Sequence, residues 1–262
     1  MKIEEQLLWL LDYLIKENNN FNQLEIPPTI EDKKLLFRAL LNIREPDIVS
    51  KEFIAIQNSY LNSENRKQIV NINDAIKYHD RVYLWQGDIT TLSVDAIVNA
   101  ANSQLLGCFI PLHQCIDNAI HSAAGVQLRL ACSDLMEKQN TLEEIGKAKI
   151  TEGYNLPAKY VIHTVGPNIK TTVSHDDEKL LENCYKNVLK LAVEKGIKTL
   201  AFCCISTGEF RFPNELATTI AVDTAINFLN EDNSDLQVIF NVFKEEDRIL
   251  YDKELRKLQT NF

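Results

Sequence analysis

The sequence predicts an α/β domain, with helices covering both faces of a central sheet, that follows a purely helical N-terminal segment. Up to about residue 75, apolar residues recur at three- and four-residue steps, which is typical of amphipathic helices. After residue 80, short runs rich in apolar and β-branched residues alternate with helical patterns. A chain of 262 residues can bury a full core. We therefore expect a helical N-terminal extension at 1–75 and an α/β domain at 76–262.

The N-terminal extension is expected to contain three helices. The first carries one apolar stripe, formed by Leu7, Leu8, Leu11, Leu14 and Ile15. After Pro27-Pro28, Thr29 with Asp32 three residues later predicts a helix start. A third helix is expected at 49–61, followed by a polar loop at 62–66. No catalytic group of residues occurs here, so we expect an extension packed on the main domain; the alternative is a separate partner-binding module.

The main domain is expected to contain six strands and four helices. The strands are predicted at 82–85, 96–99, 149–154, 160–164, 199–205 and 237–243. The helices are predicted at about 114–138, 178–195, 214–230 and 246–258. Ligands of open α/β sheets bind beyond the carboxyl ends of the strands, where this chain carries its polar clusters.

Composition and charge limit the partners. The net charge of −9 argues against broad binding to nucleic acid or to an anionic membrane. No stretch approaches the roughly 20 apolar residues that cross a bilayer, and the acidic start is unlike a signal peptide. We therefore expect a cytoplasmic protein with neither nucleic-acid nor membrane partners. Four cysteines are expected to be small buried residues: Cys132, Cys184, and the adjacent pair Cys203 and Cys204 in the predicted strand.

The segment from Gly107 to Asn118 concentrates metal-type donors. Cys108, His113 and Cys115 offer two thiols and an imidazole, which zinc prefers, and three ligands leave one coordination position open. Three alternatives remain: a structural zinc with His121 as fourth ligand, a thiolate nucleophile paired with His113, or simple packing without metal.

Three further polar clusters follow strand-like runs. Asp88, next to Ile89, offers a carboxylate that can accept from an exocyclic amine. The amides of Asn99 and Asn102 can donate to and accept from sugar hydroxyls. Backbone N–H groups around Gly208, in Ser206–Phe210, can cradle an anion such as a diphosphate. The chain has no GxxxxGK[ST] motif, so this is not a triphosphate-binding P-loop.

The order and spacing of these clusters resemble the macrodomain family. The resemblance covers about residues 75–260 and is carried by Gln86–Thr90, Val94–Asn102, Ile116–His121, Gly146–Thr151 and Tyr160–Pro167. It implies a three-layer α/β/α fold with a central mixed sheet that binds ADP-ribose. Some members of the family hydrolyse the bond between ADP-ribose and protein.

The resemblance assigns a role to each cluster. Asp88 and Ile89 would hold the adenine, and Asn99 and Asn102 would face the distal ribose. The diphosphate and distal ribose would be wrapped by Ser206, Thr207, Gly208, Glu209 and Phe210. Phe243, at the end of the last strand, would stack near the adenine. His121 and His163 match family motifs but are expected to be structural, packed or hydrogen-bonded.

One departure from the family points to a particular branch. Many macrodomains have a glycine-rich loop after the Asn pair, where this chain has Gly107–Cys115. The chain looks like the zinc-containing branch, which also carries a helical N-terminal extension. In that branch the residues matching Cys108, His113 and Cys115 bind one zinc ion beside the distal ribose, and the proteins remove ADP-ribose from modified proteins.

The chemistry of such a site follows from the residues. Zinc polarises an ester oxygen or lowers the pKa of a bound water towards about 7. Asp117 is the expected catalytic carboxylate, as general base, water-orienting group or ligand of a ribose hydroxyl, and Asn102 the expected positioner of sugar. We therefore expect a zinc-dependent hydrolase of mono-ADP-ribosylated proteins with carboxylate (ester) linkages. The alternatives are a non-catalytic ADP-ribose reader and a hydrolase of small derivatives such as acetylated ADP-ribose.

Overall fold

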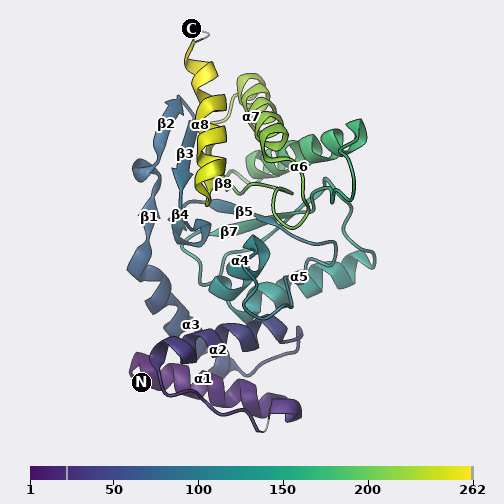
Figure 1. Ribbon diagram of the computed structural model, residues 1–262. Coiled ribbons are helices and arrows are strands. Elements are labelled where there is room, and N and C mark those ends of the chain that lie inside the picture. Colours follow the sequence, from purple (N-terminus) through teal and green to yellow (C-terminus); the bar gives the residue numbers. More distant parts are fainter. Residues whose placement is uncertain (22, 261–262) are drawn as a thin grey trace.

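The computed structural model describes residues 1–21 and 23–260. The N-terminal helices α1 (Ile3–Glu17), α2 (Ile30–Ile43) and α3 (Lys51–Asn65) surround their own hydrophobic cluster, which includes Leu7, Leu11 and Phe53. In Figure 1 they lie together below the rest of the molecule, next to α4 and α5. No helix of the described ranges is long and apolar enough to span a membrane.

Of the helix ends in this cluster, the start of α2 is determined by its local sequence, whereas the end of α3 is not. Thr29 caps α2 as predicted, since its hydroxyl oxygen accepts from the backbone N–H of Asp32 at 3.1 Å. The loop predicted at 62–66 is wrong, because α3 continues to Asn65. Tertiary contacts hold this last turn: Asn62 donates to Asn155, and Asn65 donates to the carbonyls of Ala123 and Asn155.

The main domain contains a seven-stranded mixed sheet in the order β2-β3-β9-β8-β5-β7-β6. Its strands are β2 (Ile76–His79), β3 (Val82–Gln86), β5 (Ala96–Ala100), β6 (Ala148–Glu152), β7 (Tyr160–Thr164), β8 (Thr199–Phe202) and β9 (Gln237–Val242). The five inner strands run parallel, and the edge strands β2 and β6 are antiparallel to their neighbours. The short strands β1 (Val70–Asn71) and β4 (Leu92–Ser93) form a separate parallel pair.

Helices cover both faces of this sheet (Figure 1). α4 (Ile116–Ala124) and α5 (Val126–Gln139) lie on the face towards the N-terminal helices, and α6 (His175–Glu194), α7 (Asn214–Glu231) and α8 (Glu245–Thr260) cover the other. The predicted three-layer α/β/α fold is therefore confirmed. The single helix predicted at 114–138 is wrong, because Gly125, at φ +87°, separates α4 from α5.

The strand predicted at 199–205 ends at Phe202, so Cys203 and Cys204 lie in the following segment rather than in the strand. Both are free thiols; Cys203 is buried, and Cys204 is partly buried. Because the inner strands are parallel, their carboxyl ends share one edge. The segments after β3, β5, β7, β8 and β9 therefore all emerge there, which gathers the predicted site residues.

Candidate functional site

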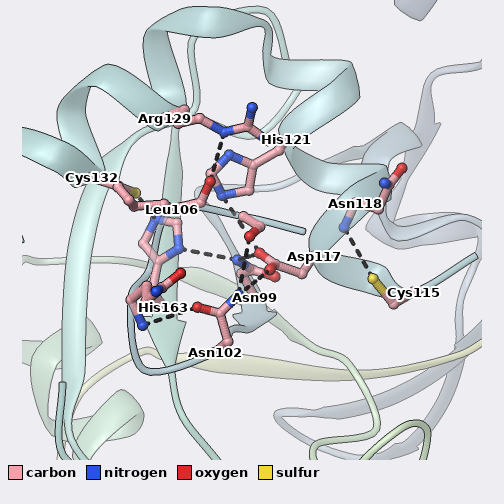
Figure 2. A network of polar contacts seen from close by, with 12 residues as sticks. Asn99, Asn102, Leu106, Cys115, Asp117, Asn118, His121, Arg129, Cys132 and His163 are labelled. Carbon is pink, nitrogen blue, oxygen red and sulfur yellow. Dashed lines mark hydrogen bonds and ion pairs between the residues drawn. The ribbon is translucent and has the colours of Figure 1, made fainter. Parts of the chain in front are cut away.

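A hydrogen-bond network links two neighbouring strands to the first turn of α4 (Figure 2). Parallel pairing of β5 with β7 sets Asn99 beside His163. The Asn99 amide nitrogen lies 2.8 Å from Oδ1 of Asp117, to which it donates, and 3.2 Å from Nδ1 of His163. Nε2 of His163 lies 2.9 Å from the Thr151 hydroxyl. His163 is therefore a hydrogen-bonded residue of the interior, as expected.

Burial controls the ionisation of this network. Burial raises the pKa of Asp117 to about 6, although the Asn99 amide and the charge of Arg129 favour its ionised form. Burial lowers the pKa of His163 to about 4, and it holds the pKa of His121 well below its usual value. Asp117 is thus a carboxylate that ionises close to neutrality among neutral imidazoles, which suits a general base.

The two asparagines have different positions. Asn102 is partly exposed; its amide donates to the Gly107 carbonyl at 3.1 Å and to Oδ2 of Asp117 at 3.4 Å. Asn99, which we expected to face the distal ribose, has no exposed surface. Direct contact of Asn99 with a sugar does not fit this burial; in the structure its amide contacts Asp117.

The three metal-type residues of the loop converge. Ligand atoms of Cys108, His113 and Cys115 all lie within 4.8 Å of one another, and the Cys108 sulfur lies 3.6 Å from Nδ1 of His113. A tetrahedral zinc ion would place a sulfur and a nitrogen ligand about 3.5 Å apart. Cys115 is also the N-cap of α4, where its sulfur accepts from the Asn118 backbone N–H. The donor types and their spacing both fit a zinc ion.

A second group of donors, formed by His121, Cys132 and His163, is buried behind the first. His163 already uses both ring nitrogens, towards Asn99 and Thr151. This group is therefore better explained as packing than as a metal site. His121 belongs to this second group and not to the Cys/His loop, as we call Gly107–Cys115, which does not support His121 as a fourth ligand there. The ring of His121 packs against Gly107, where an added Cβ would lie 2.8 Å from it.

The segment after β8 faces the Cys/His loop. Oε1 of Glu209 lies 3.6 Å from Nε2 of His113, which joins the two loops. Ser206 adopts a left-handed φ of +66°, and its buried hydroxyl has no hydrogen-bond partner within the described ranges. Among residues 1–21 and 23–260, no hydrogen bond is donated by a backbone N–H of residues 206–210. Unpaired backbone N–H groups beside a left-handed residue form the kind of concave turn that can bind an anion.

The segment after β3 carries the predicted adenine contacts. Asp88 is exposed and caps the short 3₁₀ turn Ile89–Thr91; its Oδ1 accepts from the backbone N–H of Thr90 at 2.9 Å and from the Thr90 hydroxyl at 2.8 Å. Among the described residues only Oδ1 is engaged, so Oδ2 can accept from a ligand. Ile89 is buried. Phe243, directly after β9, is 76% exposed and lies beside this segment, since Val242 accepts from the Gly87 N–H.

Comparisons with known proteins agree with this geometry. A family model for the Macro domain matches residues 98–221. A protein-ADP-ribose hydrolase of Treponema medium is 48% identical over 258 residues, 97% of this chain and 99% of that protein. One of Staphylococcus aureus strain MRSA252 is 48% identical over 248 residues, 94% and 93% of the two chains. The chain belongs to the macrodomain family.

Solved macrodomains share the fold. The Oceanobacillus iheyensis macrodomain with ADP is 37% identical, with a TM-score of 0.64, and the match covers 72% of this chain and 97% of that one. The Trypanosoma brucei macrodomain in complex with ADP-ribose is 31% identical, with a TM-score of 0.65, covering 79% and 91%. The Treponema relative, by contrast, covers nearly all of this macrodomain protein, so it includes a counterpart of most of the N-terminal extension.

Sequence reasoning missed two residues that shape the macrodomain site. Arg129 in α5 is buried and donates to the Leu106 carbonyl at 2.6 Å, next to the Cys/His loop. A lone arginine in a helical pattern carries no sequence signal. Gly166, after β7, leaves room for Ser206, since a Cβ there would lie 2.0 Å from its hydroxyl oxygen. Its Gly-Pro motif was visible, but nothing in the sequence connects it with Ser206.

Proposed function

We propose that this macrodomain protein is a zinc-dependent hydrolase that releases mono-ADP-ribose from proteins modified on carboxylate side chains. The observation that carries the proposal is the placement of Asp117, a buried carboxylate held by the Asn99 amide, two residues after the converging set Cys108, His113 and Cys115. The relatives of Treponema and Staphylococcus, named protein-ADP-ribose hydrolase, support the substrate class.

The substrate is placed by residues on several loops. The adenine amine donates to Asp88, with Ile89 beneath and Phe243 beside the ring. The diphosphate lies against the unpaired N–H groups of Ser206–Phe210. This brings the distal ribose between Asn102 and the Cys/His loop. Contacts far from the scissile bond thereby hold the reacting carbon near Asp117.

The bond to be broken joins the anomeric carbon of the distal ribose to the oxygen of an acceptor carboxyl group. Cys108, His113 and Cys115 would hold a zinc ion, which when bound would supply Lewis-acid polarisation of an ester or ribose oxygen and lower the pKa of a water. Asp117 accepts one proton from the attacking water, whose oxygen bonds to the anomeric carbon as the bond from that carbon to the acceptor carboxyl oxygen breaks, so the water oxygen stays on ADP-ribose. The acceptor carboxylate and free ADP-ribose are released. Asn102 holds the sugar, and Asn99 holds Asp117 in its orientation.

A reader of ADP-ribose would need the adenine, ribose and diphosphate contacts but neither the Cys/His loop nor a buried carboxylate that ionises near neutrality. The deciding measurement is release of free ADP-ribose from a carboxylate-linked, mono-ADP-ribosylated protein, before and after zinc is chelated and restored. We expect release to stop on chelation and to return with zinc. His113→Ala should lose turnover far more than ADP-ribose affinity.

The two variables of this assay separate the alternatives. Undiminished release by zinc-free protein would exclude a catalytic metal and leave the chemistry to Asp117. No release by the zinc-loaded protein, with ADP-ribose still bound, would favour a reader or another linkage. Acetylated ADP-ribose in the same assay tests the small-derivative alternative.

A further inference from the structure

Helix α2 of the N-terminal extension lies against α4, which begins directly after Cys115, the last residue of the Cys/His loop (Figure 1). Arg38 and Asn42, four residues apart on α2, share one face of the helix because side chains at i and i+4 are neighbours. Both face this loop. The extension is thus in direct contact with the segment that carries the three metal-type donors.

Arg38 holds the loop at two points. Its Nη2 donates to the carbonyl of His113 at 3.1 Å and to the Asn118 side-chain oxygen at 2.8 Å. Asn118 is fully buried; its side-chain nitrogen donates to the Ile110 carbonyl at 3.0 Å, and its backbone N–H donates to the Cys115 sulfur at 3.4 Å. One guanidinium therefore fixes the backbone of one proposed ligand directly and the surroundings of a second through Asn118.

Asn42 holds the turn between Cys108 and His113. Its side-chain oxygen accepts from the backbone N–H of Leu112 at 3.0 Å, and its nitrogen donates to Ser122 at 2.9 Å. Leu112 has a left-handed φ of +57°, which is unfavourable for a residue with a branched side chain. The buried Asn42 amide stabilises a turn that the loop sequence does not favour alone.

A third contact reaches the other end of the loop. The carbonyls of Leu41 and Arg44, at the end of α2, accept from Nη1 of Arg129, at 3.0 Å from Leu41. The guanidinium of Arg129 lies 4.3 Å from the ring centre of Phe109, the residue after Cys108. Both ends and the middle of the loop are therefore connected to α2.

We propose that Arg38 and Asn42 are positioning residues of the metal centre: the N-terminal extension supplies outer contacts that preorganise Cys108, His113 and Cys115 for a zinc ion. This inference rests on the proposed zinc dependence and adds the role of the extension. Outer contacts that orient metal ligands contribute about 10- to 100-fold to metal affinity. The loop makes few backbone hydrogen bonds within itself. Its contacts with α2 therefore determine how far the loop must still be ordered, at a cost in entropy, when it binds the metal.

The test is the zinc affinity of the full-length protein, measured by competition of the metal-free form with a chromophoric chelator. Arg38→Ala and Asn42→Ala should each weaken zinc binding by about 10- to 100-fold. Arg38→Lys keeps the charge but cannot reach both acceptors in the same fork geometry, so it should be intermediate. ADP-ribose affinity should change much less, since the hydrogen bonds of Arg38 and Asn42 reach none of the residues proposed to contact the adenine or the diphosphate.

Gln57→Ala is the matched control. Gln57 is fully buried and also joins the extension to the main domain, through the Val126 N–H at 3.0 Å, but does not touch the loop. It should lower thermal stability and leave zinc affinity within about twofold of the wild type. Equal zinc loss in Gln57→Ala, or wild-type zinc affinity in folded Arg38→Lys and Asn42→Ala, would overturn the positioning role.

The same titration separates this inference from the proposed function. A wild-type protein that binds no zinc overturns both. A wild type that binds zinc tightly and releases no ADP-ribose overturns the proposed function alone, and zinc loss in Arg38→Ala then still supports the positioning role.

Discussion

Asn99 on β5 and Asp117 on α4 are joined by a hydrogen bond of 2.8 Å between the amide nitrogen and a carboxylate oxygen, both of them buried. Since the same nitrogen also faces Nδ1 of His163, the carboxylate is fixed to the interior of the sheet. The carboxylate therefore keeps its orientation without a ligand, which is what a preorganised catalytic group requires.

Replacing this carboxylate tests its chemistry. In Asp117→Asn we expect single-turnover release of ADP-ribose to fall by about 10²- to 10⁴-fold, because a neutral amide cannot accept the proton of the attacking water. ADP-ribose affinity and bound zinc should stay close to wild type. Asp134→Asn, an exposed carboxylate on α5, is the control. Unchanged release in Asp117→Asn would show that Asp117 is not the base.

The buried imidazole of His163 predicts a pH dependence of stability. Its pKa of about 4 lies below the ordinary value of 6.5, so the unfolded chain binds more protons between these values. The stabilisation is complete above pH 6.5 and is lost as pH falls through 4. It amounts to about 3 kcal/mol, at about 1.4 kcal/mol per pKa unit.

Urea unfolding of the wild type and of His163→Gln at pH 7 and pH 4 measures this contribution of His163 to the free energy of unfolding. The stability difference between the two proteins should shrink by about 3 kcal/mol on acidification. His175→Gln, whose side chain is 74% exposed, should follow the wild type at both values. A difference that is the same at both pH values would contradict a neutral buried His163.

Gly208 tests the anion-binding loop without disturbing the fold. A Cβ built on Gly208 meets nothing within 4 Å, so Gly208→Ala should leave the melting temperature unchanged. If the diphosphate approaches the backbone closely, the methyl group should reduce ADP-ribose affinity by about tenfold or more. Calorimetric titration with ADP-ribose provides the measurement. Wild-type affinity would place the diphosphate elsewhere.

Asp88 should select adenine. In Asp88→Asn the side-chain oxygen still caps the turn at Thr90, but an NH₂ group replaces the acceptor facing the ligand. The wild type should bind ADP-ribose about tenfold more tightly than its hypoxanthine analogue, about 1.4 kcal/mol, and the variant should lose this preference. Equal preference in both proteins would remove Asp88 from base recognition.

The fold could be predicted wherever the spacing of apolar residues along the sequence indicates which face of a helix or strand is buried. The long helices and inner strands were found because their buried residues recur at regular steps. The strands β1, β2 and β4 were missed, since they contain only two to four residues and much of their surface is exposed. The last turn of α3 was missed because distant partners hold it, not its own sequence.

The site was predictable where residue type implies chemistry, as for Cys108, His113 and the two asparagines. Arg38 and Arg129 were not, because they act on backbone carbonyls 75 and 88 residues away. Because every residue has a backbone carbonyl, the sequence does not indicate which carbonyl accepts from these arginines. The burial of Asn99 beneath Asp117 also depended on the register of β5 against β7.

The buried guanidinium of Arg129 joins the macrodomain to the N-terminal extension. Two of the three carbonyls that it reaches, those of Leu41 in α2 and of its C-cap Arg44, lie on the far side of the predicted boundary near residue 75. A fragment trimmed to the macrodomain would lose both of these acceptors and expose to water the surface of α4 and α5 that the N-terminal helices cover. Fragments chosen by family boundaries would present an altered surface to any inhibitor screen, so such work should begin with full-length protein.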